Sequence, residues 1–217
     1  MSYVIAIDGP SGSGKGTVAK ALQEKLGLIN IDTGATYRCL ALKVLENSVD
    51  INNEEEIIKL SENLNIKMDN EGHVYLDDED VSLKIRSKEV TSIVSPISSI
   101  VKVRENLVKL QRELAKGNKV VVEGRDITTV VFPNAEYKIY LDATLEERVK
   151  RRVKQNKELN IDMTYDEVYE SMSKRDYNDM HKEVGALKRT EDQVYIDSTN
   201  MSIDEVVNKI ISLIEEV

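Results

Sequence analysis

The chain has 217 residues, of which 41% are hydrophobic, and this length and composition predict one compact catalytic unit of moderate size. Acidic residues outnumber basic ones by 39 to 30, so the net charge of -9 argues against a protein that coats nucleic acids, and any phosphate site must be locally basic. The longest apolar stretches are too short to span a membrane and the single cysteine excludes an internal disulfide, so we expect a cytoplasmic protein with small-molecule substrates.

Short apolar segments alternate with helical segments along the chain. Almost uniformly apolar segments rich in Val, Ile and Tyr predict buried parallel strands at 3–8, 119–123, 137–142 and 194–197. Helical patterns cover 17–26, 100–116, 145–157 and 203–216. This alternation predicts an α/β fold in which helices flank a parallel β-sheet.

A glycine-rich segment, Gly9-Pro-Ser-Gly-Ser-Gly-Lys-Gly-Thr17, lies between the first predicted strand and the first predicted helix. Backbone N–H groups of such a loop point at phosphate oxygens, and the helix adds the positive end of its dipole. Lys15 would reach the β- and γ-phosphates, and Thr17 would lie near Mg²⁺ because Gly16 takes the usual Ser/Thr position. The residues expected to bind the donor nucleotide are Gly9, Pro10, Ser11, Gly12, Ser13, Gly14, Lys15, Gly16 and Thr17.

Other interpretations of this segment fit less well. A strand–helix turn without a ligand is disfavoured by a lysine at this spacing. A dinucleotide-binding fingerprint requires a third glycine where Thr17 stands, and a nucleophile elbow requires a glycine where Ser13 stands. The segment therefore predicts a nucleoside triphosphate site.

Two regions interrupt the alternation of strands and helices. Residues 65–83 contain the turn signal Asp69-Asn-Glu-Gly72, which predicts a hairpin within a substrate lobe of about residues 38–100. Residues 150–189 are crowded with charge and poor in large apolar side chains, which predicts solvated helices that form a mobile lid. The chain, 1–217, is predicted to be a single domain with these two additions.

Two arginines indicate a second anion site. Arg38 ends the segment Ile31-Asp-Thr-Gly-Ala-Thr-Tyr-Arg38, and Arg125 follows a predicted strand in Glu123-Gly-Arg-Asp126. Ligands of α/β sheets bind at the carboxyl ends of strands, and a planar guanidinium can hold a phosphate through two hydrogen bonds. Either arginine alone could instead form a surface salt bridge, but the pair together favours a phosphate site.

The chain resembles the bacterial cytidylate kinase family over nearly its whole length. The motifs that carry the resemblance are Ile7-Asp-Gly-Pro-Ser-Gly-Ser-Gly-Lys-Gly-Thr17, Asp32-Thr-Gly-Ala-Thr-Tyr-Arg38, Gly124-Arg-Asp126, Val130-Val-Phe-Pro133 and Ser173-Lys-Arg-Asp176. The resemblance implies a P-loop NTPase fold with an inserted monophosphate-binding lobe and a helical lid. It also implies transfer of a phosphate from ATP, with Mg²⁺, to CMP or dCMP.

The resemblance also assigns roles to single residues. It places Thr33 among the substrate-binding residues and assigns the acceptor phosphate to Tyr37, Arg38 and Arg125. It assigns the cytosine ring to Ser95, Arg104 and Asp126, and the sugar to Arg175 and Asp179. The sequence departs from the family in the lid, where Lys182 replaces an arginine and Gly185-Ala-Leu187 replaces a stretch that usually contains proline.

Catalysis is expected to rest on Lys15, Arg125 and a lid arginine. We expect Arg151 to reach the transferring phosphate, with Arg152 and Arg148 as further candidates. A general base is not required, because a phosphate monoester with a second pKa of about 6 is already largely deprotonated at neutral pH.

Two alternatives stay open: a kinase with broader UMP/CMP or other small-molecule specificity, and a non-catalytic regulator that binds ATP. A regulator has no need for Arg38, Arg125 and Arg175 to converge, so their positions distinguish the classes. We expect a monomer without a metal site built from protein ligands alone, since His73 and His181 lack Cys or His neighbours at ligand spacing.

Overall fold

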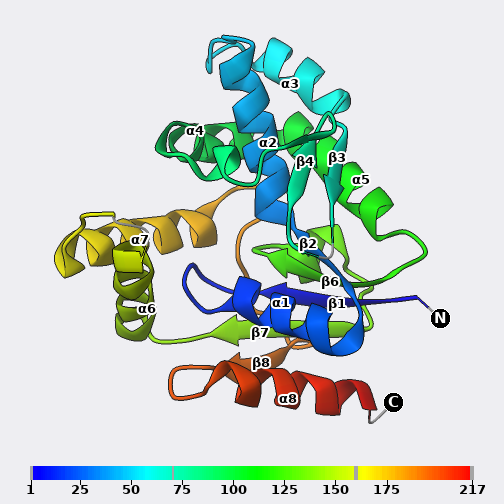
Figure 1. The fold of residues 1–217 in the computed structure, drawn as a ribbon, viewed down its shortest axis with the longest axis vertical. Coiled ribbons are helices and arrows are strands. Elements are labelled where there is room, and N and C mark those ends of the chain that lie inside the picture. Colours follow the sequence, from blue (N-terminus) through cyan, green and yellow to red (C-terminus); the bar gives the residue numbers. More distant parts are fainter. Residues whose placement is uncertain (1, 70, 159–160, 216–217) are drawn as a thin grey trace.

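The computed structural model describes residues 2–69, 71–158 and 161–215. Parts of three predicted segments lie outside these residues: position 70 of the hairpin turn, positions 159–160 of the lid and position 216 of the last helix. The main sheet has the order β2-β6-β1-β7-β8, and every neighbouring pair is parallel (Figure 1). Its strands are β1 (Tyr3–Asp8), β2 (Ile29–Asp32), β6 (Lys119–Gly124), β7 (Tyr137–Asp142) and β8 (Val194–Asp197).

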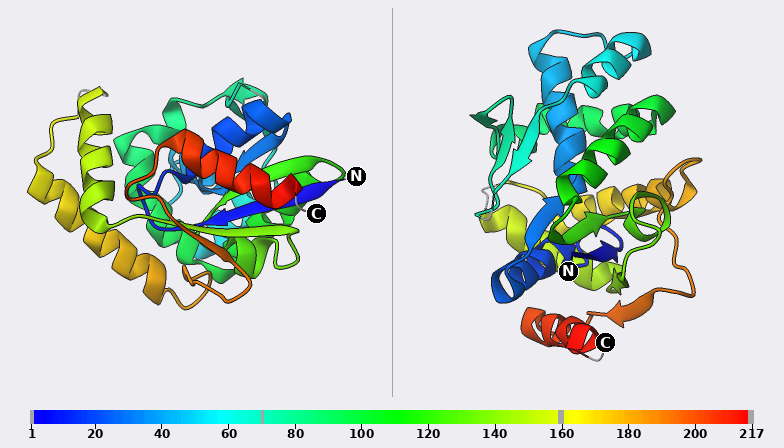
Figure 2. Two further views of the ribbon diagram at one scale, coloured as in Figure 1. Left: turned by 90° about the horizontal axis from the view of Figure 1, so that it is seen from below. Right: turned by 90° about the vertical axis from the view of Figure 1, so that its right-hand side faces the viewer.

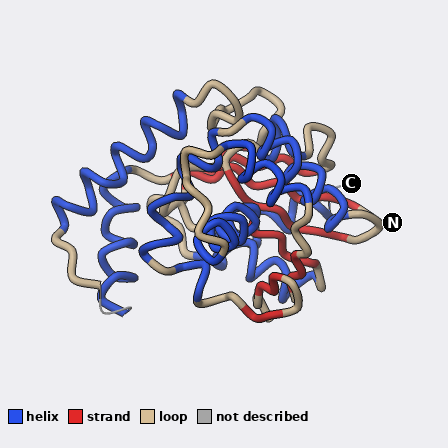
Figure 3. The backbone as a smooth tube through the Cα atoms, turned by 90° about the horizontal axis from the view of Figure 1, so that it is seen from above, coloured by secondary structure: helices blue, strands red, loops and turns tan. Residues whose placement is uncertain are grey.

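Helices cover both faces of this sheet. Helices α1 (Lys15–Leu26) and α8 (Ile203–Glu215) pack on one face, where Ile5 and Ile7 of β1 join one apolar cluster. Ala6, between them in the sequence, points to the opposite face, which α5 (Val101–Ala115) covers. Helices on both faces allow β1, β6 and β7 to be apolar throughout, which confirms these three predicted buried strands (Figure 3). The strand predicted at 194–197 also forms, as β8, but three of its four residues are exposed because it lies at the edge of the sheet.

The region between β2 and β6 forms a lobe above the sheet in Figure 1. Its elements are α2 (Thr33–Glu46), α3 (Glu54–Glu62), β3 (Ile66–Met68), β4 (Val74–Leu76), β5 (Glu79–Asp80), a 3₁₀ turn η1 (Lys84–Arg86), α4 (Lys88–Ser99) and α5. The lobe has an apolar cluster of its own, which runs in sequence from Ala35 to Leu107. The predicted hairpin is confirmed, because β3 and β4 pair in antiparallel fashion with Ile66 opposite Leu76.

Helices α6 (Leu145–Glu158) and α7 (Tyr165–His181) form a separate arm beside the sheet (Figure 2). A capping box starts α7, in which Thr164 and Glu167 exchange hydrogen bonds between side chain and backbone. The arm has a small apolar cluster whose fully buried members are Val149, Val168 and Met172. None of the helices within the described residues is long and apolar enough to cross a membrane.

Strand β2 was not predicted. Its sequence, Ile29-Asn-Ile-Asp32, is only four residues long and alternates apolar with polar side chains. It lies at the edge of the sheet, where β6 is its one neighbour among the described strands. An edge strand needs less apolar sequence than a central one, so its signal is weaker.

Candidate functional site

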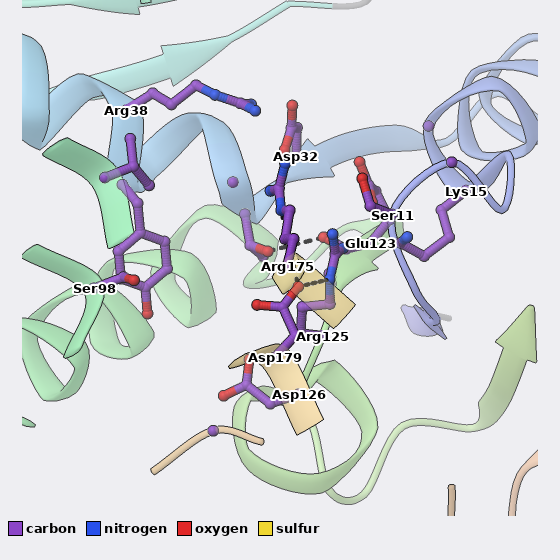
Figure 4. A pocket seen from close by; sticks show the side chains of 18 of the residues that line it. Ser11, Lys15, Asp32, Arg38, Ser98, Glu123, Arg125, Asp126, Arg175 and Asp179 are labelled. Carbon is purple, nitrogen blue, oxygen red and sulfur yellow. Dashed lines mark hydrogen bonds and ion pairs between the residues drawn. The ribbon is translucent and has the colours of Figure 1, made fainter. Parts of the chain in front are cut away.

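A pocket of about 350 Å³ opens where the carboxyl ends of β1, β2 and β6 meet. Its walls come from the glycine-rich loop, the lobe and the arm of α6 and α7 (Figure 4). Among the described residues that line it, eight side chains are cationic and four are acidic. The pocket is therefore locally basic in a chain whose net charge is -9, as an anionic ligand requires.

The glycine-rich loop places Lys15 at the start of α1 and at the base of the pocket. Gly14, directly before it, adopts the left-handed conformation with φ 96°. Lys15 is buried, and its Nζ donates a hydrogen bond to the carbonyl oxygen of Pro10 at 2.9 Å. Burial and then the nearby charge of Arg125 lower the pKa of Lys15 to about 7, while Glu123 acts in the opposite direction. The lysine thus lacks a strong anionic partner, which a phosphate would supply.

A second cationic cluster faces the loop across the pocket. Arg125 follows β6, and its Nε donates to Oδ2 of Asp179 at 2.9 Å. Lys182 lies 3.1 Å from the other carboxylate oxygen of Asp179, and Nε of Arg175 lies 3.9 Å from Oδ2. Burial raises the pKa of Asp179, but Arg125 and Lys182 outweigh this effect and hold the pKa below its usual value. One buried carboxylate therefore holds three cations together.

Other arginines of the pocket have no such partner. Arg38 of α2, Arg86 and Arg152 line the pocket, and their side chains make no hydrogen bond or ion pair to the described residues. In the view of Figure 4, Arg125 and Arg175 lie between Lys15 on one side and Arg38 on the other. Arg38, Arg125 and Arg175 thus line one pocket, and their role as an acceptor site stays a prediction.

The far end of the pocket contains a buried ion pair. Nη2 of Arg104 donates to Oδ2 of Asp126, and Nη1 of Arg104 donates to the carbonyl oxygen of Ser98 at 3.3 Å. The Arg104 guanidinium lies 5.6 Å from the ring centroid of Tyr37. Burial raises the pKa of Asp126, although Arg104 opposes this effect. Tyr37 also lines the pocket.

Two expected site residues occupy other positions. Ser95 is exposed and lies outside the pocket lining, where Ser98, one helical turn later in α4, takes part instead. Arg151 donates to the backbone carbonyls of Ser13 at 3.3 Å and of Ser198 at 2.7 Å, behind the loop. The arginine of α6 that lines the pocket is Arg152.

Arg148 also supports the glycine-rich loop rather than lining the pocket. It is buried and donates to the carbonyl oxygens of Ala143 and Ser11, at 2.9 and 3.0 Å. A third hydrogen bond, at 2.5 Å, goes to Oδ2 of Asp176 in α7. Arg148 therefore connects both helices of the arm to the loop.

The sequence did not reveal the role of Asp8, the last residue of β1. Its side chain is fully buried and accepts hydrogen bonds from the backbone N–H groups of Ile127 and Thr128, at 2.8 and 2.9 Å. The Thr128 hydroxyl donates to the same carboxylate at 2.6 Å. Asp8 lies directly before Gly9, so these hydrogen bonds connect the start of the glycine-rich loop to the segment that follows Asp126. A carboxylate at the end of an otherwise apolar strand is the signal that could have indicated this role.

Oxygen atoms suitable for a magnesium ion lie beside Lys15. Thr17, Asp32 and Glu123 line the pocket there, with one hydroxyl and two carboxylates. Mg²⁺ prefers oxygen ligands and retains several waters, so this set fits a nucleotide-bound magnesium ion. Thr33 is buried nearby and donates to the carbonyl oxygen of Glu123 at 2.8 Å.

A different group, Asp69, Glu71 and His73, gathers metal-ligating atoms within 4.8 Å in the hairpin. The Asp69 carboxylate already accepts hydrogen bonds from the backbone N–H groups of Glu71 and His73 and from the hydroxyl of Tyr75. These contacts stabilise the turn and do not involve the pocket.

The fold and the pocket define a class of protein. A lysine-bearing glycine-rich loop on a parallel sheet faces an arginine cluster in the same pocket, as in P-loop phosphotransferases whose acceptor is itself anionic.

Comparisons with known proteins identify the family. The family model "Cytidylate kinase" matches residues 5–216. The cytidylate kinase of Caldicellulosiruptor bescii is 48% identical over 216 residues, covering 98% of this chain and 96% of the relative. That of Fusobacterium nucleatum is 45% identical, covering 100% and 99%. The chain therefore belongs to the cytidylate kinase family.

A solved structure supports the fold. The shikimate kinase from Bacteroides thetaiotaomicron matches with a TM-score of 0.50 and 16% identity, covering 98% of both chains. At this identity the likeness concerns the fold alone. It agrees with the predicted P-loop NTPase fold of a parallel sheet flanked by helices.

Proposed function

We propose that this enzyme transfers the γ-phosphate of ATP to CMP or dCMP and releases ADP and CDP or dCDP. The observation that carries the proposal is that Lys15 and the cluster of Arg38, Arg125 and Arg175 line one pocket. A donor triphosphate and an acceptor monophosphate can then meet without an intermediate carrier. Membership of the cytidylate kinase family supports the same reaction.

The chain's own residues would act by position and charge. The loop N–H groups and Lys15 hold the donor phosphates, while Arg38 and Arg125 hold the acceptor phosphate in line with them. Mg²⁺ bound to ATP, near Thr17, Asp32 and Glu123, supplies further neutralisation of phosphate charge. Arg152 and Arg175 add positive charge from the arm, and Arg151 supports the loop from behind.

Asp126 and Arg104 would select the base. Cytosine offers an exocyclic amine that donates to a carboxylate, and a carbonyl and ring nitrogen that accept from a guanidinium. Uracil would turn an acceptor toward Asp126, so the buried carboxylate would face the base without receiving a hydrogen bond from it, which costs about 1–3 kcal/mol. UMP should therefore be the poorer substrate, with Ser95 or Ser98 near the base.

We propose further that the lobe of about residues 38–100 binds the monophosphate and that residues 150–189 form the lid of one domain. Arg175 and Asp179 would contact the sugar from this lid. Closure would exclude water and suppress hydrolysis of ATP. We expect a monomeric, cytoplasmic enzyme whose partners are ATP and CMP or dCMP.

A coupled assay of diphosphate formation tests the function. Purified enzyme with ATP and Mg²⁺ is offered CMP, dCMP, UMP, AMP and GMP in separate reactions. Selective turnover of CMP and dCMP is the expected result. Dominance of UMP would favour the broader specificity, and ATP binding without turnover of any monophosphate would favour a regulator.

A further inference from the structure

The segment that follows α7, residues 182–187, crosses the far end of the pocket, where Arg104 and Asp126 form their ion pair. We call this segment the strap. Lys182 and Gly185 of the strap line the pocket, and its last two residues, Ala186 and Leu187, are buried. Two contacts fix the strap to Asp179. Lys182 reaches its carboxylate at 3.1 Å, and the N–H of Leu187 donates to its carbonyl oxygen at 2.8 Å. The strap is therefore held on both sides of Gly185.

Gly185 presents bare backbone to the ion pair of Arg104 and Asp126. A Cβ atom at this position would overlap Nη2 of Arg104 and would lie 2.5 Å from its Cζ and 2.7 Å from Oδ2 of Asp126. Gly185 also has a φ of +70°, a conformation that residues with a side chain rarely adopt. Both properties require glycine at this position.

We propose that Gly185 is a specificity-determining residue, because it lets the strap close directly over Arg104 and Asp126. This inference rests on the proposed role of that pair in reading the cytosine base. Close backbone cover keeps water away from the two charged groups, so their hydrogen bonds to a base are stronger and a mismatched base is rejected more strongly. A side chain at this position would hold the strap away and admit water.

The substitution Gly185→Ala tests the proposal, with Gly117→Ala as its matched control. Gly117 has a φ of +76°, so alanine there suffers the same backbone strain, but a Cβ at Gly117 has nothing within 4 Å. We expect Gly185→Ala to raise the KM for CMP about tenfold and to reduce the preference for CMP over UMP, while the KM for ATP changes little. Gly117→Ala should leave all three quantities near their original values. An unchanged KM for CMP, or an equal rise for CMP and ATP, would overturn the proposal.

A stability cycle tests the contact without any assay of activity. In urea unfolding, Gly185→Ala should destabilise the parent more than Gly117→Ala does, because overlap with Arg104 adds to backbone strain. In an Arg104→Ala background the difference between the two substitutions should shrink, because only the close approach to Oδ2 of Asp126 remains. Should Gly185→Ala prevent folding, recovery of folding in the Arg104→Ala background is the expected result.

An extra cost of Gly185→Ala that is undiminished without Arg104 would show that contacts other than the one with Arg104 require the glycine, and it would refute the inference. The cycle can be measured even if CMP proves not to be the substrate. Failure of the proposed function and failure of the strap contact are therefore separate outcomes.

Discussion

The main sheet and the arm of α6 and α7 are stabilised in different ways. Among the described residues, one face of the sheet gathers thirteen buried apolar residues, whereas the arm gathers three. The arm compensates with charged contacts, since Arg148 and Arg151 bind loop carbonyls and Asp179 binds Arg125 and Lys182. Apolar packing makes the sheet rigid, while the ion pair between Arg125 and Asp179 would weaken if Arg125 bound a phosphate instead. The catalytic loop thus rests on the rigid part, and the part that would move is attached by groups that respond to ligand charge.

The largest effect should come from a residue held by the rigid part. Lys15→Met should reduce kcat by about 100-fold or more, because a positive charge at the transferring phosphate is lost. The melting temperature should hardly change, since the buried ammonium is replaced by an apolar side chain of similar length. Steady-state kinetics and thermal unfolding measure the two quantities. Wild-type turnover in this variant would remove Lys15 from the mechanism.

The same substitution in the two regions tests the comparison directly. Val121 in β6 and Val149 in α6 are both 0% exposed. Val121→Ala should lower the free energy of unfolding by about 2 kcal/mol, because it leaves a cavity in the main core. Val149→Ala should lower it by less than about 1 kcal/mol, since the loss is limited to the small stability of the arm. Urea unfolding followed by circular dichroism gives both values.

Hydrogen exchange in α7 provides a second readout for this pair. Exchange there should accelerate in Val149→Ala and stay unchanged in Val121→Ala. Equal losses of global stability, together with slow exchange in α7, would mean that the arm is as firmly packed as the sheet.

Removal of the negative charge of Asp179 should have a smaller effect. In Asp179→Asn, Arg125 and Lys182 lose their common anion and repel each other, so amide exchange in α7 without nucleotide should accelerate about tenfold. Asp166→Asn is the control, because Asp166 is an exposed acid of the same helix. Unchanged exchange in Asp179→Asn would show that the ion pairs do not hold the arm.

The smallest expected effect is the uptake of a proton by Lys15 when ATP binds. Its pKa is lowered to about 7 by burial and by Arg125, so at about pH 8 the amine is mostly neutral in the free enzyme. A bound triphosphate favours the charged form and raises this pKa, so ATP binding should take up part of one proton, and affinity should fall as the pH rises through 7. Calorimetry in buffers of different ionisation enthalpy measures the uptake.

Lys15→Arg is the reference for this measurement, because arginine stays protonated throughout and protons exchanged by ATP itself cancel in the difference. Equal uptake by both enzymes would assign the proton to another group.

The sequence predicted the central fold well because its signals are local. Four apolar strands, the glycine-rich loop and the hairpin depend on composition and turn residues that can be read within short windows. The edge strand β2 carried too little apolar sequence to be recognised.

The orientation of single side chains was harder to predict. Arg151 and Arg152 are neighbours on α6, yet successive helical residues point about 100° apart, so only one of them can line the pocket. Ser95 and Ser98 lie only about 60° apart around the axis of α4, but they are separated by about 4.5 Å along it, so the position along the helix decides between them. Which member of each pair lines the pocket depends on where the helix axis lies, and packing far along the chain determines that position.

The buried carboxylate of Asp8 has a consequence for the approach of the two nucleotides. It continues directly into the donor loop at Gly9 and, through Ile127 and Thr128, holds the segment that carries Arg125. The position of Arg125 relative to the glycine-rich loop, which we propose to hold the acceptor and the donor phosphates, is therefore set when the protein folds, before either nucleotide binds. On that proposal, substrate binding need not supply the free energy of bringing Arg125 to the loop, and any motion of the arm would affect when the reaction occurs rather than the distance between these two groups.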